Sequence, residues 1–231
     1  EAKMKVYGKN VFKELENNLK SIKKIYISKN FKDQEIINII KKNKMNYEFM
    51  DLHVMDKLVT GNHQGLVMDI SDFEYSDVAE FYDDKCVVML DHLVDPHNLG
   101  AIIRTCEAAG IKSIIIPKDR SVSVNDTVYK TSAGALSNVS VSMVNNLVKT
   151  INDFKDQGFF VYGSAMDGKN YSKIDYSDKV LLIIGNEGKG ISRLVKENCD
   201  EIVKIPMYGQ VNSLNASVAA GILVYDIVNR W

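Results

Sequence analysis

Short apolar runs alternate with amphipathic segments along most of the chain. Over its C-terminal two thirds, the runs are rich in Val, Ile and Leu, and the segments between them have the apolar spacing of helices. Strands that alternate with helices favour a parallel sheet that is covered on both faces. We therefore predict an α/β fold whose parallel strands lie near residues 85–90, 113–116, 139–143, 158–164, 180–184 and 202–205.

The first seventy residues predict a second, smaller α/β unit. Its expected elements are a helix over 10–19, a strand over 22–28, a helix over 33–42, a strand over 47–50, a helix over 51–59 and a strand over 65–70. An acidic stretch with few aliphatic residues follows and is typical of a linker. We expect a small domain over 1–70, a linker over 71–84 and the parallel-sheet domain over 85–231.

Two loops that follow predicted strands are rich in glycine and small polar residues. The strand 180–184 leads into Gly185-Asn-Glu-Gly-Lys-Gly190, and the strand 202–205 leads into residues 206–217. In open α/β sheets, ligands sit beyond the carboxyl ends of the strands, where backbone donors and acceptors are free. Two such loops in one short segment indicate a single ligand that is held largely by main-chain groups.

The first of these loops lacks the chemistry of a phosphate cradle. A Walker A loop ends in Gly-Lys-Ser or Gly-Lys-Thr, whereas Gly190 is followed by Ile191 and Ser192. A carboxylate at Glu187 would also repel a phosphate, and no Rossmann glycine pattern follows the first strand. A ligand that carries positive charge fits this loop better.

A third loop has the same position after a strand. The strand 85–90 leads into an irregular loop over 91–97, and Asn98 has the position of an N-cap for a helix over 99–109. That helix carries Arg104. From there the long side chain of Arg104 can turn back toward the strand ends. An arginine that only faces solvent would have no role at that place.

These segments contain Asn98-x-Gly100-x3-Arg104, Gly185-Asn-Glu-Gly-Lys-Gly190 and Ile205-Pro-Met-x-Gly-x-Val-x-Ser213-Leu-Asn215-x-Ser217. They resemble, in order and spacing, the three motifs of SpoU/TrmH-type RNA 2′-O-ribose methyltransferases of the SPOUT class. The resemblance covers about residues 85–231. It implies a C-terminal domain with a deep trefoil knot that binds S-adenosylmethionine. Composition and periodicity do not reveal a knot, since knotted chains are rare exceptions.

The resemblance also implies roles for single residues. The expected catalytic residues are Arg104, Asn98, Glu187, Ser213 and Asn215, and the expected cofactor contacts are Gly185, Ile205 and Leu214, with Met207 and Gly134 as further candidates. Structural alternatives exist for several of them. Helix capping alone would explain Asn98, Ser213 and Asn215, and a reading without the family would assign Ile205 and Leu214 to the core.

The chemistry of methyl transfer to a hydroxyl restricts what Arg104 can do. A guanidinium stays protonated in proteins, so it is a poor base. We expect Arg104 to bind the adjacent phosphate and orient the 2′-hydroxyl, while that phosphate or a water accepts the proton. Asn98 is expected to hold Arg104 or the substrate. Glu187 is expected to anchor Arg104 or Asn215, or to favour the sulfonium of the cofactor.

The N-terminal region carries a second, shorter resemblance. Val6-Tyr-Gly-Lys-Asn-Val11 and Gly61-Asn-His-Gln-Gly65 resemble the branch of the family that methylates a guanosine in 23S rRNA. This implies a small RNA-binding domain similar to certain ribosomal proteins. His63 either contacts RNA or satisfies a turn; the residues leave both alternatives open.

Charge is unevenly distributed, although the total is only −1. Residues 1–44 hold twelve lysines against five acidic residues, and residues 45–80 hold one lysine against eight acidic residues. A lysine-rich beginning can attract RNA phosphates even when the whole chain is close to neutral. The alternative is that these lysines only solvate helix faces.

Composition is that of a globular protein, with 45% hydrophobic and 26% charged residues. No apolar run approaches the ~18 residues of a membrane span, and we expect a cytoplasmic protein without a signal peptide. The three cysteines, Cys86, Cys106 and Cys199, are an odd number without paired Cys/His spacing. We therefore expect reduced thiols and no metal.

The final helix, over 214–231, is apolar around most of its circumference, with small alanines on its remaining side. Such a helix must be covered on more than one side, and the resemblance implies a homodimer formed through the C-terminal domain. Three functions stay open: ribose methylation of a guanosine in 23S rRNA, the same chemistry on tRNA or another rRNA nucleotide, and a catalytically silent RNA-binding assembly factor. The intact motifs argue against the third.

Overall fold

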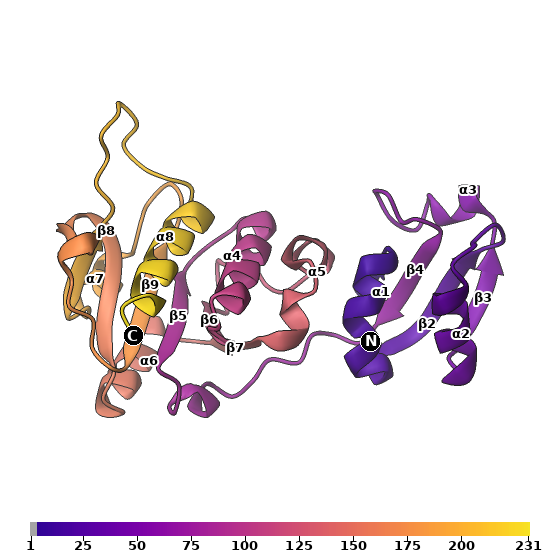
Figure 1. The fold of residues 1–231 in the computed structure, drawn as a ribbon, viewed down its shortest axis with the longest axis horizontal. Coiled ribbons are helices and arrows are strands. Elements are labelled where there is room, and N and C mark those ends of the chain that lie inside the picture. Colours follow the sequence, from indigo (N-terminus) through magenta and orange to yellow (C-terminus); the bar gives the residue numbers. More distant parts are fainter. Residues whose placement is uncertain (1–3) are drawn as a thin grey trace.

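The computed structural model describes residues 4–231, in which two β-sheets lie side by side along the long axis of the molecule (Figure 1). The N-terminal sheet has the strand order β1-β4-β2-β3; β4 is antiparallel to both β1 and β2, whereas β2 and β3 are parallel. Its elements are β1 (Met4–Tyr7), α1 (Lys9–Leu15), β2 (Ile22–Ser28), α2 (Gln34–Lys42), β3 (Tyr47–Met50), α3 (Leu52–Met55) and β4 (Leu66–Ile70).

The three strands predicted for this unit are confirmed, but two of its helices are shorter than expected. The helix expected over 10–19 is α-helical only to Leu15, because a 3-10 segment follows in which Asn18 leaves helical backbone angles. The helix expected over 51–59 is the single turn α3, because Lys57 and Leu58 then donate to the carbonyls three residues before them and form turns. The sequence pattern does not predict β1.

The C-terminal sheet has six strands that are all parallel, as predicted, in the order β10-β8-β9-β5-β6-β7. Its strands are β5 (Cys86–Asp91), β6 (Ser113–Pro117), β7 (Ser140–Val144), β8 (Phe160–Asn170), β9 (Val180–Gly185) and β10 (Glu201–Lys204). The α-helices that accompany them are α4 (Pro96–Ala108), α5 (Asp126–Ser132), α6 (Leu147–Asp156), α7 (Arg193–Glu197) and α8 (Ala216–Val228).

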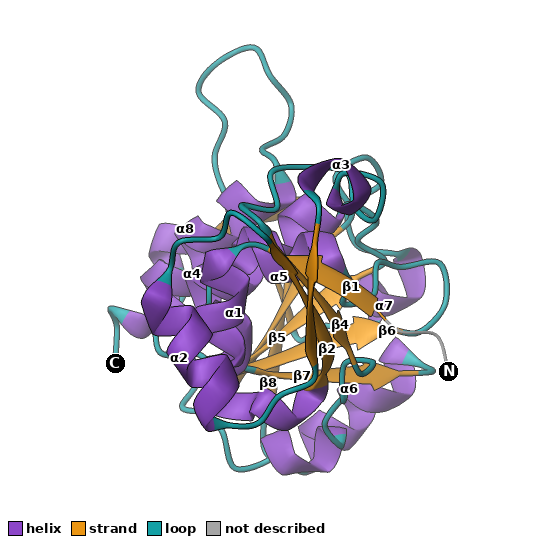
Figure 2. Ribbon diagram, turned by 90° about the vertical axis from the view of Figure 1, so that its right-hand side faces the viewer, coloured by secondary structure: helices purple, strands orange, loops and turns teal. Residues whose placement is uncertain are grey.

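Helices cover both faces of the parallel sheet, so that strands occupy the middle of the molecule (Figure 2). Successive residues of a strand point to opposite faces. Along β5, Val88 and Leu90 join the buried cluster that includes α4 and α8, whereas Val87 and Met89 join the cluster that includes α6 and α7. Because both faces are buried, the strands read as continuous apolar runs in the sequence.

The acidic segment 71–84 packs along the parallel-sheet part. The Tyr75 hydroxyl accepts a hydrogen bond from the Val124 N–H at 2.9 Å, and Phe73 lies edge-on to Tyr129 with ring centroids 6.4 Å apart. Phe81, in a 3-10 turn over Val78–Phe81, is only 2% exposed. In residues 4–231, no helix is long and apolar enough to cross a membrane.

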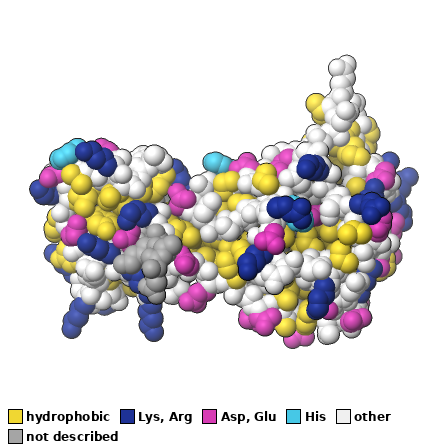
Figure 3. Space-filling view, turned by 180° about the vertical axis from the view of Figure 1, so that it is seen from behind, with side chains coloured by type: hydrophobic (Ala, Val, Ile, Leu, Met, Phe, Trp, Pro, Cys, Tyr) yellow, Lys and Arg dark blue, Asp and Glu magenta, His cyan; other side chains and the backbone are white. Residues whose placement is uncertain are grey.

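The two oppositely charged segments of the N-terminal unit interleave in space. Lys24 pairs with Glu48 at 2.7 Å and Lys29 pairs with Asp51 at 3.0 Å, each joining the basic segment to the acidic one. A contact of the same kind joins Lys5 to Asp69. Basic and acidic side chains are accordingly mixed on the face shown in Figure 3, and the charge division seen along the sequence is not a division of the surface.

Candidate active site

The loops that carry two of the predicted motifs leave the parallel sheet side by side. Asp91, the last residue of β5, is paired in register with Gly185, the last residue of β9. The loop 91–97 and the loop 185–190 therefore start at neighbouring positions on the carboxyl edge of the sheet. This is the edge at which open α/β sheets bind ligands.

A cavity of about 480 Å³ lies at this edge. Its walls come from four segments: residues 164–167 of β8, residues 184–191 at and after the end of β9, Lys196 of α7, and residues from 205 to 219 after β10 and in the first turn of α8. Six residues predicted for the site line it, namely Gly185, Glu187, Ile205, Met207, Ser213 and Leu214. The fold thus gathers residues that lie up to 29 positions apart in the sequence around one space.

The loop after β9 folds back on itself as a tight hairpin. Asn186 and Gly190 exchange two backbone hydrogen bonds, at 3.0 and 2.8 Å. A Cβ atom on Gly185 would lie 2.2 Å from the carbonyl carbon of Gly190, so any side chain there would displace the loop. Glycine at position 185 is therefore needed for the close approach of two backbone segments.

Asn186 connects this hairpin to the loop after β5, a role that the sequence analysis missed. Its Oδ1 accepts from the Gly188 N–H at 2.9 Å, and its Nδ2 donates to the His92 carbonyl at 2.9 Å. Asp91 makes a second connection, because its buried carboxylate accepts from the Ser192 N–H at 2.5 Å. Asp91 ends β5 and Asn186 directly follows β9, and this position at adjacent strand ends is the sequence signal that points to them.

The interpretation of Asn98 as a helix cap is wrong. α4 begins at Pro96, and the cap is Asp95, whose carboxylate accepts from the His97 N–H at 2.9 Å. Proline suits the first helical position because its φ is already fixed and its missing N–H is not needed there. Asn98 consequently lies within the first turn of α4, where its side chain is not needed for capping.

Asn98 instead contacts Glu187 across the two loops. Its Nδ2 donates to Glu187 Oε1 at 2.5 Å, and Asn98 is only 7% exposed. The partners expected for Glu187 from the sequence were Arg104 and Asn215; the side-chain contact in the structure is with Asn98. Because Glu187 also lines the cavity, this bond sets the position of a half-buried carboxylate at the ligand site.

Arg104 lies on the exposed side of α4 and does not line the cavity. Within residues 4–231 it makes no ion pair or side-chain hydrogen bond. The side chain was expected to turn back toward the strand ends, and in the single chain no partner there receives it. A free guanidinium next to α8, which packs against α4, remains available to another molecule.

Of the remaining predicted residues, one caps a helix, one is exposed at the cavity and one lies away from it. Asn215 is the N-cap of α8, since its Oδ1 accepts from the Ser217 N–H at 2.9 Å, so the capping interpretation holds for its side chain. Ser213 is exposed at the cavity. Gly134 is not among the cavity-lining residues; it lies in the turn between α5 and a 3-10 segment over Ala135–Asn138.

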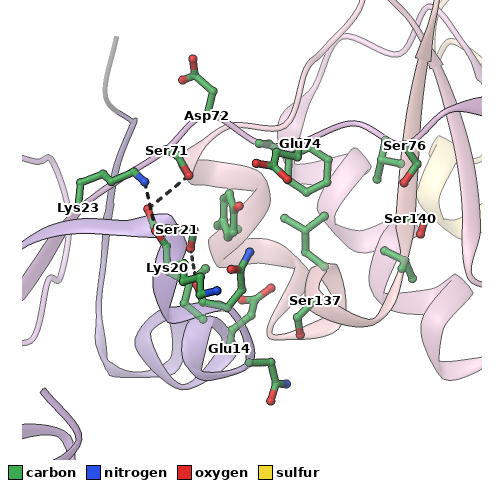
Figure 4. A pocket seen from close by; sticks show the side chains of 18 residues that line it. Glu14, Lys20, Ser21, Lys23, Ser71, Asp72, Glu74, Ser76, Ser137 and Ser140 are labelled. Atoms are coloured by element: carbon green, nitrogen blue, oxygen red, sulfur yellow. Dashed lines mark hydrogen bonds between the residues drawn. The ribbon is translucent and has the colours of Figure 1, made fainter. Parts of the chain in front are cut away.

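A different cavity, of about 580 Å³, lies between the N-terminal unit and the parallel-sheet part and contains none of the predicted site residues (Figure 4). Glu14 of α1 lines it, and both carboxyl oxygens of Glu14 are buried without a hydrogen-bond partner among residues 4–231. Burial raises the pKa of Glu14 to about 7. The backbone N–H groups of Gly134 and Leu136 oppose this shift without making hydrogen bonds of normal geometry.

The same structure places the candidate metal ligands and the cysteines of residues 4–231. Among residues 4–231, no group of three or more His, Cys, Asp or Glu side chains is arranged to hold a metal ion. Burial raises the pKa of Cys106 and Cys199 to about 12, and it raises the pKa of Cys86 as well. These thiols are therefore protonated at neutral pH, which is the unreactive form.

A parallel α/β sheet with a cavity at its carboxyl edge is the arrangement of a ligand-binding α/β protein. Comparison with known families specifies it further: the chain belongs to the SpoU rRNA methylase family, which matches residues 85–225. A second family, described as RNA 2′-O ribose methyltransferase substrate binding, matches residues 5–76. The protein is thus an RNA methyltransferase of the SpoU/TrmH type and of the SPOUT class, a family that uses S-adenosylmethionine.

Relatives match over nearly the whole chain. A protein of Bacillus subtilis named as a TrmH family tRNA/rRNA methyltransferase is 38% identical over 97% of this chain and 95% of its own length. One of Staphylococcus aureus with the same family name is 41% identical over 90% of this chain and 89% of its own length. Both names include tRNA and rRNA, so they leave the RNA substrate of this chain open.

Solved structures share the fold over 99% of this chain. The SpoU methyltransferase AviRb from Streptomyces viridochromogenes, in complex with the cofactor AdoMet, superposes with a TM-score of 0.83 at 20% identity and 90% coverage of its chain. An AdoMet-bound rRNA methyltransferase from Sinorhizobium meliloti gives 0.81 at 22% identity and 87% coverage. At such identities the likeness concerns the fold, which agrees with the predicted α/β class; the knot stays a prediction.

Proposed function

We propose that this protein transfers a methyl group from S-adenosylmethionine to a ribose 2′-hydroxyl of structured RNA, with a guanosine of 23S rRNA as the first candidate substrate. The observation that carries the proposal is the cavity at the carboxyl edge, where Glu187 is positioned by Asn98 beside the glycine-bracketed hairpin. The match of residues 5–76 to a ribose methyltransferase substrate-binding family supports the 2′-hydroxyl as the acceptor.

The residues around the cavity suit this cofactor. Its volume of about 480 Å³ is within the range typical of small-molecule sites. Ile205, Met207 and Leu214 supply apolar surface, and the backbone around Gly185 supplies main-chain groups. The carboxylate of Glu187 can face a positively charged group of the ligand, and Lys189 and Lys196 on the same wall can face a negatively charged one. When bound, the cofactor supplies the methyl group.

The protein's contribution to the reaction is then orientation. Alignment of two reactants in one site can lower a barrier by about 7–11 kcal/mol in favourable cases. Arg104 binds the phosphate next to the target ribose and orients the 2′-hydroxyl. That phosphate or a water accepts the proton of the hydroxyl, because a guanidinium is already protonated and cannot accept it. Ser213 and Asn215 position the substrate at the cavity, and Gly134 is retained as a further candidate for a cofactor contact.

A homodimer formed through the C-terminal domain would complete this site. On α8 and just after it, Val218, Tyr225 and Trp231 are 49%, 43% and 46% exposed, an apolar surface that a partner copy would cover. Arg104 lies on the neighbouring helix α4, which packs against α8, and within residues 4–231 its exposed side chain makes no ion pair or side-chain hydrogen bond. In the proposed dimer, Arg104 of one protomer reaches the cavity of its partner.

The proposal assigns RNA binding to residues 1–70, a connecting role to residues 71–84, and cofactor binding and catalysis to residues 85–231, in the cytoplasm and without a metal. The alternative substrate is tRNA or another rRNA nucleotide, which the relatives' names favour equally. A catalytically silent assembly factor is disfavoured because Glu187 and its Asn98 contact are intact.

Mapping of ribose methylation in total RNA tests the proposal. RNA from cells with and without the protein should differ at one or a few 2′-O-methylated positions, and purified protein with S-adenosylmethionine should restore them in vitro. Restoration in 23S rRNA supports the first candidate, and restoration in tRNA supports the alternative. An unchanged methylation pattern, together with no transfer in vitro, would contradict the enzymatic function.

A further inference from the structure

The N-terminal sheet has a cavity of its own at one edge, with a volume of about 420 Å³. The carboxyl ends of β1, β2 and β3 and the amino end of β4 meet at this edge, as the pairing of Tyr7 with Val67 and of Ile27 with Leu66 shows. Four loops therefore surround one space. Its chemistry comes from Lys9, Asn30, Phe31, Lys32, Asn62 and Gln64.

The walls of this cavity are preformed. The Ser28 N–H donates to the Gly65 carbonyl at 2.9 Å, and a Cβ on Gly65 would lie 3.1 Å from Ser28 Cβ and 3.2 Å from the Phe31 ring. His63 is 4% exposed; its Nδ1 accepts from the Gly65 N–H at 3.0 Å, and its Nε2 donates to Asp56 at 3.0 Å. Of the two alternatives for His63, the structure has the one in which it satisfies a turn.

Two amide side chains on the rim have fixed orientations. Asn62 Oδ1 accepts from the Gln64 N–H at 3.2 Å, and Gln64 Oε1 accepts from the Lys9 N–H at 3.0 Å. With both oxygens engaged, the two NH₂ groups remain as donors, and neither has a hydrogen-bond partner among residues 4–231. The ammonium of the exposed Lys32 has no ion pair within the same residues. The rim thus offers donors and positive charge.

An aromatic side chain beside an ion-paired lysine completes the cavity. Phe31 is half-buried, and the Lys9 ammonium lies over its ring, 5.3 Å from the centroid. The nearby carboxylates are already engaged, Asp33 by Lys9 at 3.0 Å and Asp56 by His63. The ligand that fits is planar, accepts hydrogen bonds and carries negative charge, which describes a nucleotide.

We propose that this cavity binds an unpaired nucleotide of the RNA substrate. In an RNA duplex the bases are stacked and paired, whereas in loops and bulges they can stack on an aromatic ring and expose their polar edges. The inference rests on the proposed RNA substrate and adds a structural requirement to it. The N-terminal unit then recognises RNA through a base that is unpaired in the RNA. Attraction between lysines and phosphates alone would not give this selectivity.

The experiment uses the full chain and two labelled RNAs, a hairpin with unpaired guanosines in its loop and a fully paired duplex of the same length. Phe31→Leu keeps apolar bulk but removes stacking, so we expect the Kd for the hairpin to rise about tenfold while the Kd for the duplex stays unchanged. The matched control is Phe49→Leu on β3, where Phe49 is 51% exposed and outside the cavity. Neither Kd should change in the control.

Lys32→Glu provides a second variant at an exposed position, in case Phe31→Leu does not fold. The hairpin Kd should again rise about tenfold, whereas Lys41→Glu, at the other end of α2, should change it by less than about threefold. Wild-type hairpin binding in both cavity variants, or equal wild-type affinity for hairpin and duplex, would overturn the inference. Displacement of the hairpin by guanosine monophosphate at equal concentration would overturn it too, because the cavity would then bind free nucleotides.

The result can be separated from the proposed function. Loss of hairpin binding in Phe31→Leu, in a protein that methylates no RNA, would leave the nucleotide site standing and remove the enzymatic proposal. Unchanged hairpin binding in Phe31→Leu, in a protein that does methylate RNA, would remove the nucleotide site and leave the enzymatic proposal standing. Binding of S-adenosylmethionine should be equal in wild type and both cavity variants. Circular dichroism and the urea-unfolding midpoint report whether the N-terminal unit of each variant is folded.

Discussion

The cavities of the two sheets differ in the chemical groups that build them. At the parallel sheet, apolar side chains and glycine-bracketed backbone surround Glu187, and the charged side chains of Asp167, Lys189 and Lys196 also line the wall. At the N-terminal sheet, amide, ammonium and aromatic groups line the space, and the nearby carboxylates are engaged by other residues. One cavity, with charged groups of both signs and apolar side chains, suits a zwitterionic small molecule. The other suits a nucleotide of an anionic polymer. The comparison suggests that the chain separates cofactor and RNA recognition by the chemistry of the two linings.

The largest effect that would test this separation is expected for Leu214→Arg. Leu214 lines the cofactor cavity, and a guanidinium there occupies space and places positive charge beside a cationic ligand. We expect the Kd for S-adenosylmethionine, measured by calorimetry without added metal, to rise at least about 100-fold, while RNA affinity changes less than about threefold. Leu194→Arg, at a leucine that is 56% exposed on α7, is the matched control. Normal cofactor binding in Leu214→Arg would move the site elsewhere.

Arg104→Lys should have the next largest effect and should leave both cavities able to bind their ligands. Lysine keeps the charge but lacks the bidentate fork, so we expect kcat to fall roughly 100-fold with both Kd values retained. Mixing Arg104→Ala with Leu214→Arg protomers should recover part of the activity that each lacks, if the site is shared in a dimer. Full activity in Arg104→Lys would reduce the residue to a point charge, and a fully active monomer in light scattering would contradict the shared site.

The architecture follows from the sequence because it depends on apolar periodicity. All six parallel strands and three of the four N-terminal strands lie where alternation and apolar runs predict them. β1 is the exception: it is only four residues long, Met4–Tyr7, and its pairing with β4 is a contact between distant parts of the chain. Local patterns carry no information about which strand a short edge segment will join.

The candidate site is only partly readable from the sequence, because contacts between loops are not periodic. The choice of Asp95 over Asn98 as the cap of α4 depends on the proline at position 96, and it decides whether Asn98 can reach Glu187. The need for glycine at position 100 also comes from a contact between distant segments, because a Cβ there would lie 1.8 Å from Thr131 Oγ1 on α5. The family motif includes this glycine, but only the packing of α4 on α5 explains it.

The contact between Asn98 and Glu187 predicts an effect of intermediate size, confined to the cofactor side. Asn98→Asp keeps the shape but puts a second carboxyl group 2.5 Å from Glu187, where both cannot be ionised at low cost. We expect activity to fall about tenfold at pH 8 and to recover toward about pH 5.5, because the introduced carboxyl group, once protonated, can donate to Glu187 as the Asn98 amide does. RNA affinity should not change. A loss that is independent of pH would show that the hydrogen bond is not what Asn98 contributes.

The smallest expected effect concerns Glu14, which lies between the two cavities where α1 meets the parallel-sheet part. Burial raises the pKa of Glu14 from its usual value near 4.5 to about 7. Between these values the folded protein holds a proton that the unfolded chain has released. Folding stability from this group is therefore present at low pH, declines as pH rises from about 4.5 to about 7, and stays reduced above that.

Glu14→Gln cannot ionise and should remove this pH dependence. We expect wild type to lose about 1 kcal/mol or more of unfolding free energy between about pH 5 and pH 8 that the variant keeps. Urea unfolding at several pH values measures it, and Glu16→Gln, at an exposed carboxyl two residues away, is the control. If the cofactor cavity and the N-terminal cavity bind their ligands independently, the Kd for S-adenosylmethionine and the Kd for RNA should both stay unchanged in Glu14→Gln. A change in either would mean that the contact at Glu14 couples RNA binding to cofactor binding.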